Sequence, residues 1–195
     1  MLNRQILNMS FTGPISDLST PLRRLAGVCR VPIGFEASTP ETTTSCAGDD
    51  PHAVRVSVDK GTWRDVLQTL IDAAPTYTWE ELAGVVNVSP REKIDSLPNV
   101  VLKRFEADCA DPDDALRRLT RAREVKQWLK RNGIEQRDFS ASPDPLAGRK
   151  RTLPIALADS SVRTILNTVL RSSGRYYWAY FRYGRDNRFF SLTLS

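Results

Sequence analysis

The sequence contains a single histidine, His52, and only three cysteines in 195 residues. One imidazole excludes any metal or catalytic site that needs two histidines. The apolar runs are only a few residues long, which excludes a helix that spans a membrane. No charged-then-apolar leader opens the sequence, so we expect a signal peptide to be absent or already removed. A glycine-rich phosphate loop, an HExxH motif and a CxxC pair are also missing, so no motif predicts a cofactor.

Charge is plentiful but uneven, with a net charge of +5. Residues 1–95 carry 9 Lys and Arg against 12 Asp and Glu, whereas residues 96–195 carry 19 against 11. A basic half joined to an acidic half indicates either two partners or one anionic partner on one side. Net charge that serves only solubility explains the same numbers.

An internal repeat is the strongest signal in the sequence. The segment 54–79 lies on the segment 153–178 at a shift of 99 residues. The identical pairs are Arg64 and Arg163, Leu67 and Leu166, Thr69 and Thr168, Tyr77 and Tyr176, and Trp79 and Trp178. An upstream block, from Phe11 to Leu25, matches Phe105 to Leu119 at a shift of 94. The two shifts place a five-residue insertion between Leu119 and Leu153 and indicate a duplication.

Each unit reads as strand, helix, strand, strand, helix, strand, strand. We therefore predict an α+β protein of two tandem βαββαββ units, with two helices packed between small sheets in each. The units cover residues 1–92 and 97–195, and each is expected to have its own core. The segment 90–98, which is polar with a proline at each end, is the predicted linker.

The helices of the first unit follow from apolar spacing and capping residues. Asp17 or Ser19 is the predicted N-cap of the first helix. Its predicted apolar stripe comprises Leu18, Leu22, Leu25 and Val28. Thr62 caps the second helix, with Asp65 three residues on. The predicted buried face of this helix comprises Trp63, Val66, Leu67, Leu70 and Ile71. A hairpin around Ala83 and Gly84 closes the unit.

The second unit repeats this order with a longer first helix, predicted over 113–130. The alternating residues of 153–157 predict a strand, and a helix follows over 162–171. Gly174 is the predicted stop of this helix. Strands over 176–180 and 189–194 form the closing hairpin.

Both units resemble the secretin and TonB N-terminus short domain, which has the same order of elements. The matching residues of the first unit are Leu22, Leu25, Val56, Val58, Thr62, Val66, Leu67, Leu70, Pro75, Tyr77, Val86 and Val88. Those of the second are Leu116, Leu119, Ile155, Leu157, Ser161, Ile165, Leu166, Val169, Gly174, Tyr176 and Leu192. The resemblance implies a non-enzymatic protein-interaction module of the bacterial envelope, located in the periplasm and bound to a protein partner. It supplies no catalytic residue.

Two acidic features suggest metal ligands, and each has a plainer explanation. Asp111, Asp113 and Asp114 lie where a helix begins, and carboxylates at that place cap amide groups. His52 follows Asp49 and Asp50 in a polar loop, but real sites need three or four ligands. We therefore predict no metal.

The three cysteines are Cys29, Cys46 and Cys109. In an oxidising compartment Cys29 and Cys46 could form a disulfide, which would leave Cys109 unpaired. The alternative is three free thiols, and counting the reactive thiols of unreduced protein separates the two.

A basic and aromatic hairpin over 175–190 is the most unusual local feature. Aromatic residues fall on both of its faces, which predicts that one face stays partly exposed as an interaction site. The predicted protein-binding residues are Tyr177, Trp178, Phe181, Arg182 and Arg185. The alternative function is binding of nucleic acid or another anionic polymer through the basic second unit, which strong salt dependence would favour.

Overall fold

The computed structural model describes residues 5–14, 18–37, 53–92, 95–107, 112–141, 154–183 and 189–195. It has the mixed α+β fold that the sequence predicts. The first half contains β1 (Gln5–Pro14), α1 (Ser19–Cys29), β2 (Ile33–Glu36), β3 (Ala53–Thr62), α2 (Trp63–Asp72), β4 (Tyr77–Leu82) and β5 (Val85–Pro90). The second half contains the 3₁₀ helix η1 (Leu97–Asn99), β6 (Val101–Ala107), α3 (Pro112–Arg121), α4 (Arg123–Arg131), β7 (Glu135–Ala141), β8 (Ile155–Ser161), α5 (Val162–Ser173), β9 (Tyr177–Tyr183) and β10 (Phe189–Leu194).

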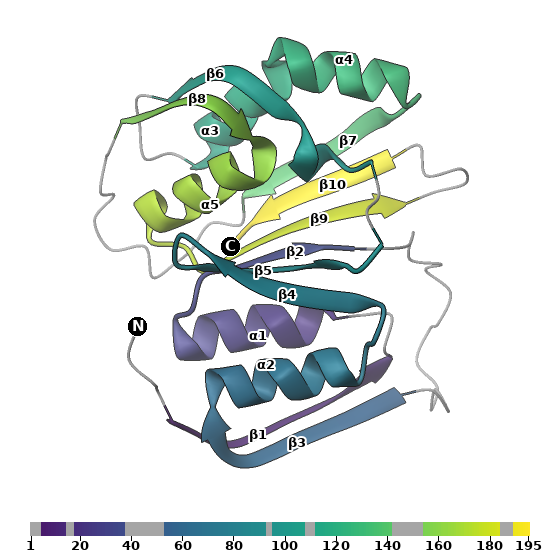
Figure 1. Ribbon diagram of the computed structural model, residues 1–195, viewed down its shortest axis with the longest axis vertical. Helices are drawn as coiled ribbons and strands as arrows, with labels where there is room; N and C mark the ends of the chain where they lie inside the picture. The colour runs from purple at the N-terminus through teal and green to yellow at the C-terminus, as the bar shows by residue number, and fades with distance from the viewer. Residues whose placement is uncertain are drawn as a thin grey trace.

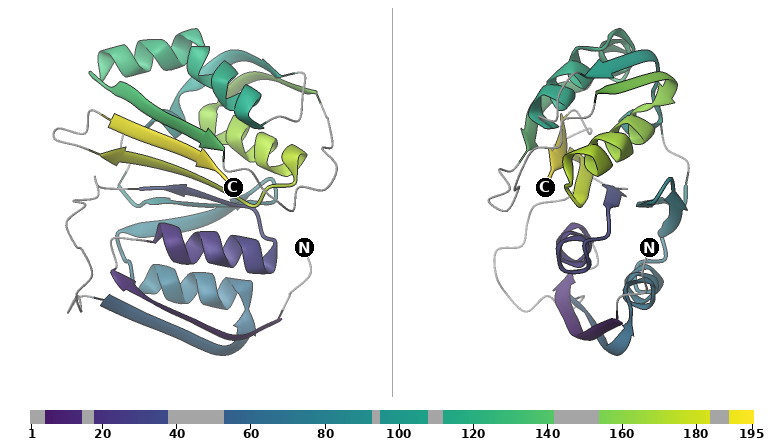
Figure 2. Two further views of the ribbon diagram at one scale, coloured as in Figure 1. Left: turned by 180° about the vertical axis from the view of Figure 1, so that it is seen from behind. Right: turned by 90° about the vertical axis from the view of Figure 1, so that its left-hand side faces the viewer.

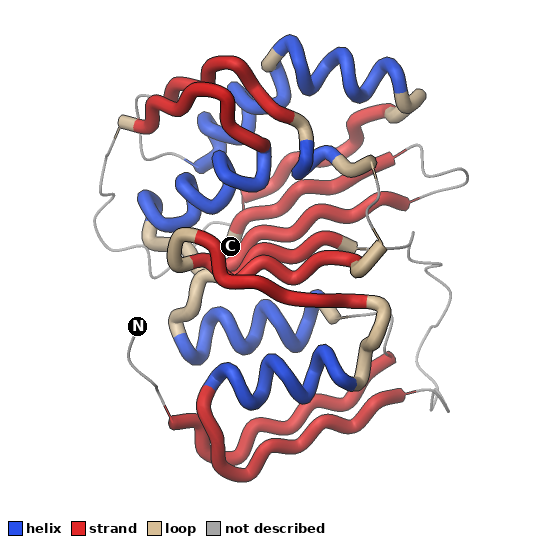
Figure 3. Tube along the Cα trace, viewed as in Figure 1, coloured by secondary structure: helices blue, strands red, loops and turns tan. Residues whose placement is uncertain are grey.

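The elements stack in layers along the long axis of the molecule (Figure 1). A six-stranded sheet in the order β4-β5-β2-β9-β10-β7 forms the middle layer. Helices α1 and α2 cover one of its faces, and α3 and α5 cover the other (Figures 1 and 3). The two-stranded sheets β1-β3 and β6-β8 form the outer layers, as the side view of Figure 2 also shows.

The same strand pairs occur in both halves. In the first half β1 and β3 are antiparallel, β2 and β5 parallel, and β4 and β5 antiparallel. In the second half β6 and β8 are antiparallel, β7 and β10 parallel, and β9 and β10 antiparallel. Parallel pairing of β2 with β9, from Ile33 opposite Tyr177 to Glu36 opposite Tyr180, joins the two halves.

Two clusters of buried side chains lie on opposite faces of the six-stranded sheet. The cluster under α1 and α2 also takes in Tyr177 and Ala179 from β9. The cluster under α3 and α5 takes in Val85 from β5. Because strand pairing and core contacts both cross from one half to the other, the boundaries at 92 and 97 stay a prediction.

Several local features that the sequence predicts are present in the structure. Thr62 Oγ1 accepts from the Asp65 N–H, and an Asp65 carboxylate oxygen accepts from the Thr62 N–H, which completes a capping box. The five residues predicted for the inner face of α2 are all buried. Gly174 ends α5 with a φ of 72°, a left-handed conformation that glycine adopts without strain. Ala83 and Gly84, with φ of 51° and 78°, form the turn between β4 and β5.

Other local predictions are wrong. Val28 is 59% exposed, and Ala26 and Cys29 take its place on the buried face of α1, since residue 28 lies about 100° round the helix from residue 29. Leu18 is the N-cap of α1 and makes no side-chain cap bond, so Ser19 is not the cap, while Asp17 lies outside the described residues. The single helix predicted over 113–130 is two helices, because Ala122 has the extended ψ of 139°.

Strand β7 has the place that the predicted order gives to a strand after the first helix of the second unit, but it lies in a stretch that the residue matches do not locate. One further segment differs from the prediction. The end of the predicted linker is packed inside the molecule, where Ser96, Leu97 and Pro98 are buried. Proline and polar residues at a repeat boundary therefore do not make this segment an exposed spacer.

Candidate interaction surface

The aromatic hairpin predicted as a binding surface lies mostly in the interior. Tyr177 and Trp178 are 3% and 0% exposed, so the prediction that they present a contact surface is corrected. Strand β9 is an inner strand, between β2 and β10, and a core lies on each of its faces. Aromatic residues on both faces of a strand here indicate burial on both faces.

The remaining members of that set lie closer to the surface. Phe181 is half-buried and packs edge-on against Phe35, with ring centroids 5.8 Å apart. Arg182 is half-buried, and Arg185 lies outside the described residues. A binding role for these three residues stays a prediction.

A buried ion pair holds the two halves together beside the β2–β9 junction. Glu36, at the end of β2, is 2% exposed and accepts from Arg163 of α5, with Nε and Nη2 at 2.8 and 2.5 Å from Oε1. Ser96 Oγ donates to the other carboxylate oxygen over 3.2 Å. Burial raises the pKa of Glu36 above 4.5, and the Arg163 charge opposes that shift. The partners are 127 positions apart, so no spacing in the sequence indicates the pair.

A second polar chain crosses the same junction. Trp178 Nε1 donates to Asn167 Oδ1 over 2.8 Å, and Asn167 Nδ2 donates to Asn87 Oδ1 over 3.0 Å. All three side chains are buried. Buried amides that satisfy each other in this way fix the position of one half on the other.

The first half repeats the Trp178 arrangement at its own equivalent positions. Trp79 Nε1 donates to Gln68 Oε1 over 3.0 Å, and residues 68 and 79 correspond to 167 and 178 at the shift of 99. Arg64, the equivalent of Arg163, pairs with Glu81 over 2.7 Å. The tryptophan bonds therefore connect β4 to α2 as they connect β9 to α5. The arginine pairs differ, because Arg64 binds a residue of β4 whereas Arg163 binds Glu36 of β2.

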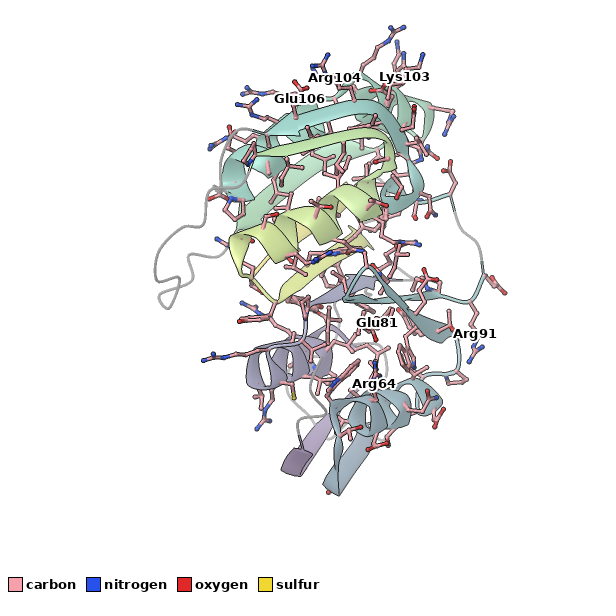
Figure 4. All side chains as sticks on the ribbon, turned by 60° about the vertical axis from the view of Figure 1, so that its left-hand side comes forward. Arg64, Glu81, Arg91, Lys103, Arg104 and Glu106 are labelled. Atoms are coloured by element: carbon pink, nitrogen blue, oxygen red, sulfur yellow. The ribbon has the colours of Figure 1, made fainter. Side chains whose placement is uncertain are left out.

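One difference separates the two equivalent strands. Strand β9 pairs with β2 on the side away from β10. The equivalent strand β4 is the outermost strand of the sheet, and no other described strand pairs with its outer side. Trp79 is accordingly only half-buried, and Glu80, Glu81 and Leu82 are exposed. Figure 4 shows Arg64 and Glu81 directed toward one another at this edge. We call the outer side of β4 the β4 edge.

A basic surface lies at the far end of the second half. Helices α3 and α4 expose a set of basic side chains. They are Arg117, Arg118, Arg121, Arg123, Lys126, Lys130 and Arg131. Lys103 and Arg104 lie near the same end of the molecule (Figure 4). Some of this charge is neutralised locally, since Arg118 pairs with Asp114 over 2.7 Å and Arg104 with Glu106.

An open pocket of about 380 Å³ lies between the segment 95–101 and α4. Asp95 forms part of its wall and accepts from Trp128 Nε1 over 2.8 Å. Arg131 lies 3.5 Å from the same carboxylate. These contacts of Asp95 connect the segment to α4.

No group of three metal-ligating side chains gathers within the described ranges. Asp113 and Asp114 lie in the first turn of α3, as the capping interpretation expects. Cys29 is buried in α1. Residues 46, 49, 50, 52, 109 and 111 lie outside the described residues, so the disulfide between Cys29 and Cys46 stays a prediction, as does the expectation that the two acidic features bind no metal.

Neither a family model, nor a curated protein, nor a solved structure matches this chain. In the part of the chain that the structure describes, no helix is long and apolar enough to cross a membrane.

Proposed function

We propose that this chain is a non-enzymatic protein-interaction module, which binds an extended segment of a partner protein by strand addition to the β4 edge. The observation that carries this proposal is the β2–β9 junction. There, the edge of β9 that is equivalent to the outer edge of β4 forms backbone hydrogen bonds with the parallel strand β2. Ile33 N–H donates to Tyr176 O over 2.8 Å, and Ala37 N–H donates to Tyr180 O over 2.9 Å.

The backbone of β4 supports the same mode of binding. Its hairpin closes at the pair Leu82 and Val85, next to the two-residue turn. Hydrogen-bonded and non-hydrogen-bonded pairs alternate along an antiparallel ladder, so Leu82 and Glu80 direct their backbone groups toward β5. Trp79 and Glu81 therefore direct theirs toward the outer side, where an added strand would bind.

The resemblance to the secretin and TonB N-terminus short domain supports an interaction role and a location in the bacterial envelope. In each half, two helices separate a two-stranded sheet from a group of three adjacent strands. Fractionation of producing bacteria tests the location. Recovery with the periplasmic contents is expected, and recovery only with the cytoplasmic contents would contradict it.

The binding mode is tested with a matched pair of variants at one position, Glu81→Pro and Glu81→Ala. Both remove the carboxylate, but only proline also removes the N–H that faces outward, and edge strands tolerate proline at such a position. Peptides selected from a displayed library of eight-residue sequences on the full chain should bind the wild type and the alanine variant. They should lose binding to the proline variant by about tenfold or more.

Both variants are first compared with the wild type by circular dichroism and thermal unfolding. N-methylation of the peptide backbone gives a second measurement that needs no change in the protein. Methyl groups at alternate peptide amides should weaken binding, and those at the intervening amides should not, because only one set faces β4. Peptides indifferent to both the proline and the methylation would overturn strand addition.

The basic surface of α3 and α4 favours a second candidate function, binding of a nucleic acid or another anionic polymer. A single-stranded oligonucleotide is the probe. Binding that falls steeply with salt, and that Lys126→Glu with Lys130→Glu abolishes, would support it. Arg23→Glu, an exposed charge reversal on α1, is the matched control. Salt-independent or undetectable binding would exclude this function.

A further inference from the structure

The junction between the halves shows what an added strand must provide. Gly34 lies opposite Trp178 in the parallel pair β2–β9. A Cβ atom at Gly34 would lie 2.3 Å from Cε2 and 2.4 Å from Cζ2 of Trp178. The indole therefore lies across the neighbouring strand, and only glycine lets that strand approach. The rotamer of one aromatic residue thus selects the residue type opposite it.

Trp79 has the equivalent position on β4. Gln68 accepts from its Nε1, as Asn167 accepts from that of Trp178. The ring also packs edge-on against Trp63, with centroids 6.4 Å apart. Two contacts from α2 thus hold the indole of Trp79, and the residue is half-buried. An indole at the position equivalent to Trp178 is expected to set the same requirement for a glycine.

The outer edges of β9 and β4 differ in charge two residues beyond the tryptophan. On β9 the buried Tyr180 lies opposite Glu36, and Glu36 pairs with Arg163. On β4 the position of Tyr180 is taken by Glu81, which already pairs with Arg64 over 2.7 Å. A second carboxylate opposite Glu81 would meet a like charge, whereas an ammonium or guanidinium group would meet an opposite one.

We propose that the segment bound at the β4 edge runs parallel to β4, with a glycine opposite Trp79 and a lysine or arginine opposite Glu81. This inference rests on the proposed function and adds its specificity. The two requirements are two residues apart and direct their side chains to the same face of the sheet. The partner is therefore a protein with an extended segment of the pattern Gly-x-(Lys/Arg).

The test uses the full chain and synthetic peptides with the sequence of residues 30–37, acetylated and amidated at their ends. The peptide with Glu36→Lys should bind, with amide shifts along β4 in a nuclear magnetic resonance titration. Adding Gly34→Val to that peptide should weaken binding about tenfold or more. The peptide that keeps Glu36 should bind more weakly than the lysine peptide, by a margin that shrinks as salt is added.

A protein variant assigns the glycine requirement to the indole. In Trp79→Ala the glycine and valine peptides should bind equally, because the ring that excludes a side chain is gone. Leu82→Ala, at an exposed position of the same strand, should keep the preference for glycine. Circular dichroism shows whether both variants fold. If Trp79→Ala does not fold, the comparison of glycine and valine peptides on the wild type tests the glycine requirement.

The outcomes separate this inference from the proposed function. Equal binding of the glycine and valine peptides, with binding still lost in Glu81→Pro, would overturn the inference and leave strand addition standing. Binding that Glu81→Pro does not change would overturn both. Shifts confined to Trp178 and β9 would mean exchange with β2 and would also contradict the inference. A concentration-dependent increase in mass that Glu81→Pro abolishes would identify a second copy of this chain as the occupant instead.

Discussion

Arg163 donates to Glu36 through two guanidinium nitrogens, and this pair lies across the junction between the two halves of the chain. Its counterpart in the first half is Arg64, which pairs with Glu81 at the surface. The side chains of Arg163 and Glu36 are 19% and 3% exposed, whereas those of Arg64 and Glu81 are 44% and 32% exposed. The equivalent arginines of the two repeat units therefore form a buried ion pair in one case and a solvent-exposed ion pair in the other.

Arg163→Met is expected to lower the free energy of unfolding by about 3 kcal/mol, because the change leaves the Glu36 carboxylate buried without its partner. Arg64→Met, the matched control, should change it by less than about 1 kcal/mol, since water solvates the exposed carboxylate. Urea unfolding of both variants measures the difference. Equal effects at the two positions would contradict this assignment.

The pH dependence of stability reports the Glu36 carboxyl group. Burial raises the pKa of Glu36 in the folded state above 4.5, so the folded chain holds this proton more tightly than the unfolded chain does. As the pH rises through 4.5, the unfolded chain releases the proton first, and the free energy of unfolding falls. This loss should be missing in Glu36→Gln, when both proteins are unfolded in urea at a series of pH values.

Glu80→Gln is the control for that comparison, because Glu80 lies 3.7 Å from the same arginine but is 61% exposed. It should keep most of the wild-type slope just above pH 4.5, because the charge of Glu80 is the smallest of the causes that shift the pKa of Glu36. The interpretation fails if wild type gains stability relative to Glu36→Gln as the pH rises through this range. That result would mean that the attraction of Arg163 outweighs burial.

The capping box of α2 gives a prediction that concerns one helix terminus. Thr62→Ala removes the acceptor for the Asp65 N–H and should cost about 1 kcal/mol of stability. Thr62→Ser keeps the hydroxyl and should lie close to the wild type. Thermal unfolding of the two variants measures the effect, and equal losses in both would show that the methyl group matters instead of the cap.

Local features of this fold could be predicted from the sequence, because their causes lie within a few residues. The Thr62 cap, the buried face of α2 and the turn at Ala83 and Gly84 each depend on neighbours in the chain. The Val28 error has the opposite cause. Its spacing fits a helical stripe, but only packing against the sheet decides which side of α1 is buried.

The candidate site could not be predicted, because it depends on how the two halves join. Pairing of β2 with β9 buries Tyr177 and Trp178 and leaves the equivalent Trp79 half-exposed. The repeat aligns Trp79 with Trp178, but an alignment does not say which of two equivalent strands has a further strand beside it. The basic and aromatic composition of 175–190 therefore predicts a binding surface on the strand that is paired on both sides.

Because Gly34 lies so close to Trp178, adding a single methyl group at position 34 is expected to lower the stability of the protein. Gly34→Ala places a Cβ atom against the indole and should lower stability by about 1–3 kcal/mol, or more where the ring cannot move. Gly27→Ala is the control, since a Cβ atom there meets nothing within 4 Å. On the exposed side of α1 it should raise stability by about 0.5–1 kcal/mol. Opposite signs in urea unfolding are expected, and a neutral Gly34→Ala would contradict the packing.

Asn167 and Gln68 make the same bond to a tryptophan at equivalent positions, and their replacement separates a buried amide from an exposed one. Asn167→Ala leaves Trp178 Nε1 and Asn87 Oδ1 without their bonds inside the molecule and should cost about 2–4 kcal/mol. Gln68→Ala exposes Trp79 Nε1 to water and should cost about 1 kcal/mol or less. If urea unfolding gives equal losses, water reaches the junction as readily as the β4 edge. The distinction between a covered and an open strand, on which the proposed binding site depends, would then be lost.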